Sequence, residues 1–300
     1  MSGQLTTKLG TGILQRVAVS GGFFEQAGGE PRPDATAWSI IALAACGSHQ
    51  QSIDQGRQFL ASLQQKDGRI SITADHPEAF WPTAPAILAW QGNSTYKQAR
   101  EMAINFLLTT AGHHPPPHPD SPLGHDTSIP GWPWVDATHS WVEPTALALL
   151  ALGISGHGSH PRARQATQLL LDRQLPGGGW NYGNTQVFGQ QLRPMPASTG
   201  LALQALADRT EQAEIESSLS YLESGIDRTL TPFSLGWGLL GLGAWGRRPT
   251  NALELIEKSL ERQDLFGGYP TTHLSLMLLA ATAGNGLRGL TSELKEPHRG

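Results

Sequence analysis

The sequence predicts an all-α protein in which six inner and six outer helices form a closed double-walled ring, an (α/α)6 toroid. Three observations predict this fold: a short apolar helical pattern recurs six times, a more polar helical pattern separates the copies, and strand signals are nearly absent. Four copies open on a similar dipeptide, at Thr36-Ala37, Thr83-Ala84, Thr145-Ala146 and Thr199-Gly200. Repeats of about 20–50 residues indicate stacked units, because one unit cannot bury its apolar face alone.

The apolar segments are expected to be the inner helices, since a helix that is apolar on most of its surface is packed on all sides. Their predicted ranges are 35–46, 82–92, 144–154, 197–208, 232–245 and 271–283. The polar segments are amphipathic, with Phe59, Leu60 and Leu63 on one stripe of the second. These outer helices are predicted at 4–17, 50–65, 95–111, 161–174, 210–223 and 249–263. The only strand-like stretch is 69–73.

Six helix pairs in strict alternation favour a closed ring, with an open superhelix as the alternative. In a closed ring all inner helices run parallel, so their N-termini gather at one mouth with free N–H groups and partial positive charge. An anion, or the polar head of an apolar ligand, is favoured at such a mouth.

The chain is expected to form a single domain over residues 1–284, followed by a polar tail over 285–300. One connection, at about 112–142, is much longer than the others. Loops above about 12–15 residues are usually functional or disordered. Because its second half carries Trp132 and Trp134, we expect a packed flap over a mouth of the ring.

Composition excludes several classes of protein. A net charge of −4 argues against nucleic acid as a partner. The single cysteine, Cys46, rules out a disulfide framework within the chain and fits a reducing compartment. No signal-peptide pattern or stretch of eighteen apolar residues is present. These features indicate a cytoplasmic protein, with contact at a membrane surface and the oligomeric state left open.

The turns that lead into the apolar helices carry a second pattern. They read Gln64-Gln65-Lys66-Asp67-Gly68-Arg69, Gln174-Leu175-Pro176-Gly177-Gly178-Gly179-Trp180 and Gln263-Asp264-Leu265-Phe266-Gly267-Gly268-Tyr269. These turns resemble the Gln-x-x-Asp-Gly-x-Trp (QW) repeat of squalene–hopene and oxidosqualene cyclases and the Gly-Gly-aromatic turns of protein prenyltransferase β subunits. The resemblance covers about residues 20–284 and implies the terpenoid cyclase/prenyltransferase toroid superfamily.

The resemblance implies a candidate acid. Class II triterpene cyclases protonate an alkene with the middle Asp of Asp-x-Asp-Asp-Thr-Ala, and 32–37 reads Arg-Pro-Asp-Ala-Thr-Ala. Asp34 therefore matches the acid, while Arg32 and Ala35 replace both flanking carboxylates. Arg32 would stabilise ionised Asp34 and so oppose proton donation. Glu143 holds the equivalent place in the third repeat and is a second candidate acid. Capping of their own helices is the alternative role of both carboxylates.

The metal-dependent activities of related toroids are not supported. The Asp-x-Cys zinc ligands of prenyltransferases have no counterpart, and His273 lies one residue from the place of the zinc-binding His. The Cys-Gly-Glu-Gln motif of thioester domains, the Cys-Cys-His set of lanthipeptide cyclases and the Asp-Asp-x-x-Asp motif of class I terpene chemistry are also missing. We therefore expect no metal and no cofactor, although eleven histidines, several in the insertion, leave a metal in that loop as an alternative.

Further candidate residues lie around the insertion and the helix starts. Asp136 and His139 fit general acid–base chemistry, or alternatively tie the loop down by hydrogen bonds. Of the nine tryptophans, several are expected to line a central cavity that suits either a carbocation or a passive isoprenoid chain. The candidate substrate-binding residues are Trp38, Trp81, Trp134, Trp141 and Trp237.

Three functions follow as hypotheses. The first is an isoprenoid-handling enzyme, an atypical terpene or triterpene cyclase or isomerase with acid catalysis in an aromatic-lined cavity and a small hydrophobic ligand. The second is a non-catalytic toroid that binds a lipid, a prenyl group or a peptide. The third is an unrelated chemistry, such as that of a lyase, since fold alone does not fix function.

Overall fold

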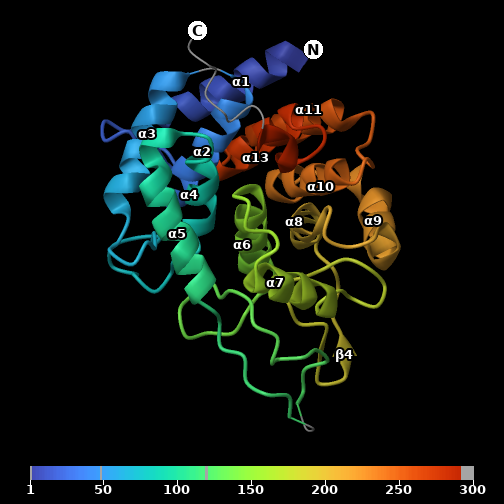
Figure 1. Cartoon of the computed structure of the whole chain (residues 1–300). Helices are drawn as coiled ribbons and strands as arrows, with labels where there is room; N and C mark the ends of the chain where they lie inside the picture. Colours follow the sequence, from blue (N-terminus) through green and yellow to red (C-terminus); the bar gives the residue numbers. More distant parts are fainter. Residues whose placement is uncertain (1, 48, 119–120, 292–300) are drawn as a thin grey trace.

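The computed structural model describes residues 2–47, 49–118 and 121–291, and within them the chain is a closed ring of paired helices (Figure 1). The inner helices are α2 (Pro33–Ala45), α4 (Thr83–Ala89), α6 (Val142–Ile154), α8 (Pro196–Leu206), α10 (Pro232–Ala244) and α13 (Thr271–Thr282). The outer helices are α1 (Ser2–Leu14), α3 (Gln50–Leu63), α5 (Lys97–Thr109), α7 (Pro161–Asp172), α9 (Gln212–Ile226) and α11 (Ala252–Glu261). The (α/α)6 toroid predicted from the sequence is confirmed.

Each inner helix packs against the next one, and α13 packs against α2, which closes the ring. Glu25 ties the two ends together: its carboxylate Oε2 accepts from the Thr272 amide at 3.1 Å and from the Thr272 hydroxyl at 2.7 Å. The Thr271 amide also donates to the Glu25 carbonyl. The open superhelix is thereby excluded.

The recurring threonines explain why the repeats fold alike. In four repeats the Thr hydroxyl at the start of the inner helix accepts, at 2.9 Å, from a buried backbone amide in the preceding turn. These pairs are Thr36 with Phe23, Thr83 with Ile70, Thr145 with Trp132, and Thr199 with Trp180. A buried N–H without such an acceptor costs about 1–3 kcal/mol, so each hydroxyl fixes its turn on its helix.

The turns also press against the next outer helix. Gly68 and Gly178 have φ of 97° and 89°, and a Cβ on either would lie 2.2–2.3 Å from a backbone carbonyl oxygen, that of Met102 or Ser217. Only glycine combines that conformation with that closeness. Beside them, Gln64 Nε2 donates to the Ala99 carbonyl in the first turn of α5 at 2.8 Å.

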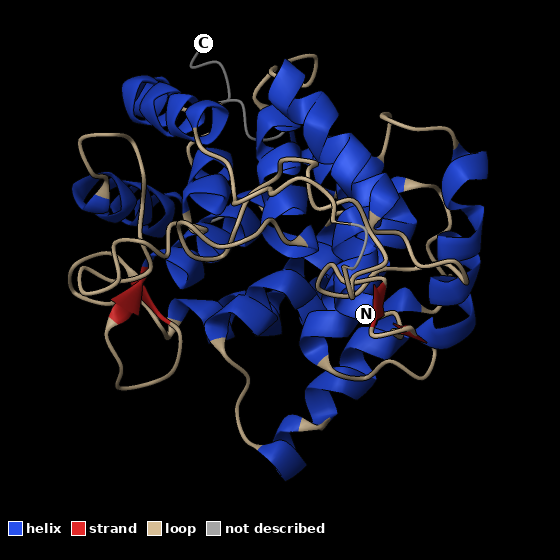
Figure 2. Cartoon of the chain, turned by 90° about the horizontal axis from the view of Figure 1, so that it is seen from below, coloured by secondary structure: helices blue, strands red, loops and turns tan. Residues whose placement is uncertain are grey.

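The strands and short helices differ from the expectation. Two two-residue hairpins form, β1 (Phe23–Phe24) with β2 (Pro31–Arg32) and β3 (Gln186–Val187) with β4 (Gln190–Gln191), and Figure 2 shows how small they are beside the helices. The stretch 69–73, predicted as strand-like, is not a strand, because only Thr73 makes an isolated bridge, to His76. Additional short helices are η1 (Ser94–Tyr96), α12 (Gln263–Phe266) and η2 (Leu287–Thr291). Inner helix α4 has only seven residues, which is shorter than predicted.

The packed chain extends beyond residue 284, where a polar tail was predicted to begin. Leu287 is buried, and its amide donates to Gln204 Oε1 in α8 at 3.0 Å. The rest of the predicted tail, residues 292–300, lies outside the described residues.

The insertion predicted at 112–142 joins α5 to α6, and its described residues before α6, 112–118 and 121–141, form no helix. Trp132 anchors it: the indole is buried, its Nε1 donates to the Leu107 carbonyl, and the Arg162 guanidinium lies 4.0 Å from the ring centroid. The insertion also pairs with the β3–β4 hairpin through Leu123 and Val187. In Figure 1 these two segments project together beyond α7.

Candidate functional site

The inner helices all begin at the same end of the ring, which we call the mouth. The small exposed fractions that remain along these helices indicate where solvent-accessible space reaches into the ring. On α6 the exposed fraction falls from 9% at Glu143 to 5% at Leu147 and 2% at Leu150, each about one turn further in. Their neighbours Ala146 and Leu149 are fully buried. Because one stripe of the helix alone keeps exposure, we infer that this stripe faces the central space.

Two other inner helices keep residual exposure along the matching stripe. On α2 the stripe is Asp34, Trp38 and Ile41, at 3%, 3% and 2%, and on α8 it is Ala197, Leu201 and Ala205, at 5%, 3% and 1%. From these exposed fractions we infer a narrow central space, called the shaft below, that is reached from the N-terminal ends of the inner helices. Asp34 and Glu143 lie at that end.

Two of the tryptophans expected to line a central cavity contact each other in this structure. Trp38 of α2 and Trp237 of α10 meet edge to face, with ring centroids 5.3 Å apart, and both are nearly fully buried. Helices α2 and α10 both flank α13 in the ring, so these two side chains meet on the inner side of α13 and close the shaft. Such an aromatic pair contributes about 0.5–1.5 kcal/mol beyond the area it buries.

Glycines let helices α8 and α10 approach each other closely at this point. A Cβ on Gly200 of α8 would lie 2.2 Å from the Trp237 carbonyl oxygen, and one on Gly241 of α10 would lie 2.4 Å from the Gly200 carbonyl oxygen. Backbones that approach this closely carry no side chain between them.

Asp34 is held in an ion pair. Arg32 donates through Nε to Oδ1 at 2.9 Å and through Nη2 to Oδ2 at 2.6 Å, and the Asp34 side chain is buried while that of Arg32 is 40% exposed. The hydrogen bond to Asp34 raises the pKa of Arg32. Both carboxylate oxygens of Asp34 are thus engaged by one guanidinium, which argues against Asp34 as a proton donor.

Glu143 is in a different environment. Its Oε1 accepts from the Ser198 hydroxyl of α8 at 2.8 Å, and no cation pairs with it among the residues that the structure describes. Burial raises the pKa of Glu143, and the Ser198 hydrogen bond offsets part of that rise. A buried carboxyl without a counter-charge retains its proton to higher pH, as a general acid requires.

Glu25 is a third carboxyl at this mouth, and the repeat pattern of the sequence did not reveal it. Burial raises its pKa against the hydrogen bonds from Thr272, and the charges of Asp34 and Arg32 also act on it. Little in the sequence could have identified Glu25 as a site residue, because it lies in the connection between β1 and β2, which no repeat pattern marks.

Asp136 and His139 lie on the exposed surface of the insertion, outside the shaft. The Asp136 carboxylate accepts from the adjacent Ala137 amide, and the Asp136 amide donates to the Glu78 carbonyl. The His139 ring lies 5.2 Å from that of Trp141. No hydrogen bond or ion pair joins Asp136 or His139 to Asp34 or Glu143 in the described part of the chain, so the structure does not bring the four predicted catalytic residues together.

The remaining predicted tryptophans lie at the rim. Trp81, just before α4, and Trp134 of the insertion meet edge to face at 5.5 Å, and Trp81 is half-buried while Trp134 lies against it. Trp141 precedes α6 and is half-buried as well. These three side chains place aromatic surface where the insertion joins the mouth.

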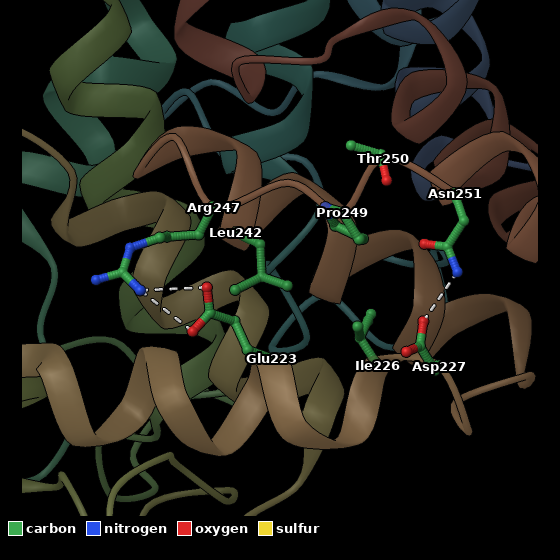
Figure 3. Close-up of a pocket in the computed structure, with 8 residues that line it drawn as sticks. All are labelled: Glu223, Ile226, Asp227, Leu242, Arg247, Pro249, Thr250 and Asn251. Atoms are coloured by element: carbon green, nitrogen blue, oxygen red, sulfur yellow. Dashed lines mark hydrogen bonds and ion pairs between the residues drawn. The ribbon is translucent and has the colours of Figure 1, made fainter.

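Two open pockets lie elsewhere on the protein. One, of about 480 Å³, is lined at the other end of the ring by residues of α9, α10 and the following loop (Figure 3). Arg247 pairs there with Glu223 at 3.3 Å, and Asn251 donates to Asp227 at 3.1 Å, so its polar groups are already engaged. Among residues 2–47, 49–118 and 121–291, no group of three or more His, Cys, Asp or Glu residues is placed to hold a metal.

No protein-family model matches the chain, and no curated protein sequence matches it significantly. Solved structures do match. The type II terpene cyclase MstE from Scytonema has a TM-score of 0.64 at 12% identity, over 97% of this chain and 98% of that one. A variant of MstE in complex with its substrate geranylgeranyl dihydroxybenzoate has a TM-score of 0.58 at 13% identity, over 97% and 98%. The GH76A α-1,6-mannanase from Salegentibacter has a TM-score of 0.63 at 13% identity, over 94% of this chain and 99% of that one.

These similarities define the class of the protein by fold. The chain has the α/α-toroid fold that the type II terpene cyclase and the α-1,6-mannanase share. Identities of 12–13% establish the architecture alone.

Proposed function

We propose that this protein is an isoprenoid-handling enzyme, an atypical cyclase or isomerase, in which Glu143 is the proton donor. One observation carries the proposal: Glu143 is a nearly buried carboxyl at the open end of the shaft, and burial raises its pKa with no cation beside it in the described chain. Asp34, the residue that the resemblance implies, is paired with Arg32 and is assigned to holding the mouth in shape.

The proposed chemistry is a net isomerisation. Glu143 gives its proton to a terminal C=C bond, whose π electrons form the new C–H bond and leave a tertiary carbocation. A neighbouring C=C bond attacks that cation and forms a ring, and the final cation loses a proton to a base. Trp38 and Trp237 line the path, and a cation over an indole face gains about 0.5–2 kcal/mol.

Binding requires the closed shaft to open. Trp38 and Trp237 must separate to admit an isoprenoid chain, and their contact is replaced by contact with the ligand. The MstE complex supports a prenyl-type ligand for this fold, since that toroid holds a geranylgeranyl compound. We therefore expect an acyclic polyprenyl alkene as the substrate.

The rim of the mouth supports contact with a membrane surface, where such alkenes reside. The large hydrophobic residues that are exposed in the described chain all lie in connections from outer to inner helices, or at the end of α3 that leads into one: Val19, Leu63, Val135, Tyr182, Phe188, Leu192, Leu265 and Phe266. Phe188 is 80% exposed and has φ of 48°, a costly backbone conformation for a bulky residue. No described helix is long and apolar enough to span a bilayer.

The test is conversion of squalene and geranylgeraniol by the purified chain, followed by mass spectrometry. The parent is expected to give products of unchanged mass. Glu143→Gln should lose at least about 10²-fold in rate, which is the usual contribution of a general acid. Asp34→Asn, if folded, should retain activity.

Parental rates in Glu143→Gln would refute the assignment of the acid. The alternative function, a non-catalytic toroid that binds a lipid, a prenyl group or a peptide, is favoured by the closed centre of the ring. It predicts co-purified ligand with no conversion by the parent chain.

A further inference from the structure

Two neighbouring arginines in the connection from α10 to α11 have opposite surroundings. Arg247 donates through Nη1 to Glu223 at 3.3 Å (Figure 3) and through Nη2 to Glu216 at 3.0 Å. Arg248 makes no hydrogen bond or ion pair within residues 2–47, 49–118 and 121–291, and its Nη1 is buried without a partner. Burial lowers the pKa of Arg248, but a guanidinium stays protonated in proteins. Arg248 is therefore a partly buried positive charge that lacks the counter-charge such groups normally have.

Arg248 lines an open pocket of about 410 Å³ at the end of the ring opposite the mouth. The pocket lies between the start of α11 and the end of α13, and the Arg248 side chain passes beside Gly284, which follows α13. Its described lining includes the hydroxyl residues Thr250 and Thr282 and no acidic residue. The Thr282 hydroxyl already donates to the Leu278 carbonyl at 2.9 Å. The charge of Arg248 is therefore not balanced from within the pocket.

The first turn of α11 adds further donors beside this pocket. Asn251 occupies the N-cap position but does not cap the helix, because its side chain donates to Asp227. The amides of Leu253, which lines the pocket, and of Glu254 donate to no acceptor in the described chain. Such free N–H groups carry the partial positive charge of a helix start. An unpaired arginine and an uncapped helix start together present the donors that phosphate groups prefer.

The surface around the pocket indicates a soluble ligand rather than a lipid headgroup. The large exposed hydrophobic residues of the described chain lie at the mouth, and none lies in the connections at the pocket end. A protein surface that lies on a membrane needs apolar residues that enter the headgroup region. The Glu254 carboxylate, close to the pocket in sequence, pairs with Lys258 at 2.7 Å and does not claim Arg248.

We infer that this pocket binds a phosphate group carried by a small soluble molecule, with Arg248 as its charged ligand. The guanidinium donates hydrogen bonds to the phosphate oxygens and supplies the opposite charge. The Thr250 hydroxyl and the free amides of α11 are the further donors at hand. Pro249, Leu253 and Ala281 offer apolar contact to the body of the molecule. The site lies at the other end of the ring from Glu143 and does not depend on the chemistry proposed there.

The alternative is that Arg248 only offsets the partial negative charge at the C-terminal end of α13. Isothermal titration calorimetry of the purified full chain with inorganic phosphate and with glycerol 3-phosphate, at low ionic strength, separates the two roles. Arg248→Gln keeps a polar side chain, removes the charge and leaves no partner unpaired, so the variant should fold. Arg193→Gln is the matched control, since Arg193 is an exposed arginine in the connection from β4 to α8.

We expect the parent chain and Arg193→Gln to bind both phosphates saturably and with equal affinity. Arg248→Gln should bind at least about 10-fold more weakly, because a charged hydrogen-bonding group is lost. No saturable binding by the parent chain, or equal affinity in Arg248→Gln, would overturn the site. Binding to phosphatidylglycerol vesicles that depends on Arg248, without binding of either soluble phosphate, would overturn the soluble ligand. None of these results bears on Glu143, because the measurement involves no turnover.

Discussion

Glu143→Gln should make the protein more stable at neutral pH, and this prediction probes the environment of the carboxyl without a substrate. The amide has the same volume and can still accept from the Ser198 hydroxyl. It carries no charge to desolvate. A residue whose removal stabilises the fold is typical of a functional site.

The sign and size of this stability change follow from the linkage between proton binding and folding. Burial raises the pKa of Glu143 in the folded chain above its ordinary value of 4.5, so the folded chain binds this proton more tightly than the unfolded chain. Stability from Glu143 is therefore lost as pH rises from about 4.5 through the folded pKa, at about 1.4 kcal/mol for each pH unit between the two values. Below that window Glu143→Gln and the parent should agree. Above it the variant should gain on the order of 1 kcal/mol, or about 2–4 °C in Tm.

The assay is urea unfolding of parent and variant at pH 4 and at pH 8, followed by tryptophan fluorescence. Glu101→Gln is the matched control, because Glu101 is exposed and pairs with Lys97 at 3.9 Å, and it should change stability by less than about 0.5 kcal/mol. Equal or lower stability of Glu143→Gln at pH 8 would refute the argument that burial penalises this carboxylate.

Three further perturbations test the site and the repeats. Ser198→Ala removes a hydrogen bond that lowers the pKa of Glu143, so the pH above which the rate declines should move upward; a pH–rate profile that stays in place contradicts this. Gly178→Ala should cost about 2–4 kcal/mol of unfolding free energy, because its Cβ meets the Ser217 carbonyl at positive φ, whereas Gly177→Ala, with open space, should cost far less. Thr199→Val should cost about 1–3 kcal/mol, since it leaves the Trp180 amide unpaired; urea unfolding of each variant gives the value, and a neutral effect would show that the hydroxyl does not fix the repeat.

The ring could be predicted from the sequence because its determinants are local and recur. The threonine at each inner-helix start and the glycines of the turns act within one repeat or on the next, so reading the copies against one another reveals them. The common mouth followed from strict alternation, and Asp34 and Glu143 lie there as expected.

The centre of the ring could not be predicted in the same way. The contact of Trp38 with Trp237 joins helices that are not neighbours and depends on the radius of the ring. The close approach of α8 and α10 at Gly200 and Gly241 is likewise visible only once the two helices lie together. Glu25 was missed for a related reason, since its partner Thr272 is 247 residues away.

The protonation state of Glu143 gives the most direct test of its role as the acid. Infrared difference spectra of parent against Glu143→Gln, recorded across a pH titration, isolate the carbonyl stretch of this one carboxylic acid. We predict that the band persists above pH 4.5 and is absent from the variant. A band that has already fallen to half its strength at pH 4.5 would show an ordinary surface-like carboxylate and would contradict the assignment of Glu143 as the acid.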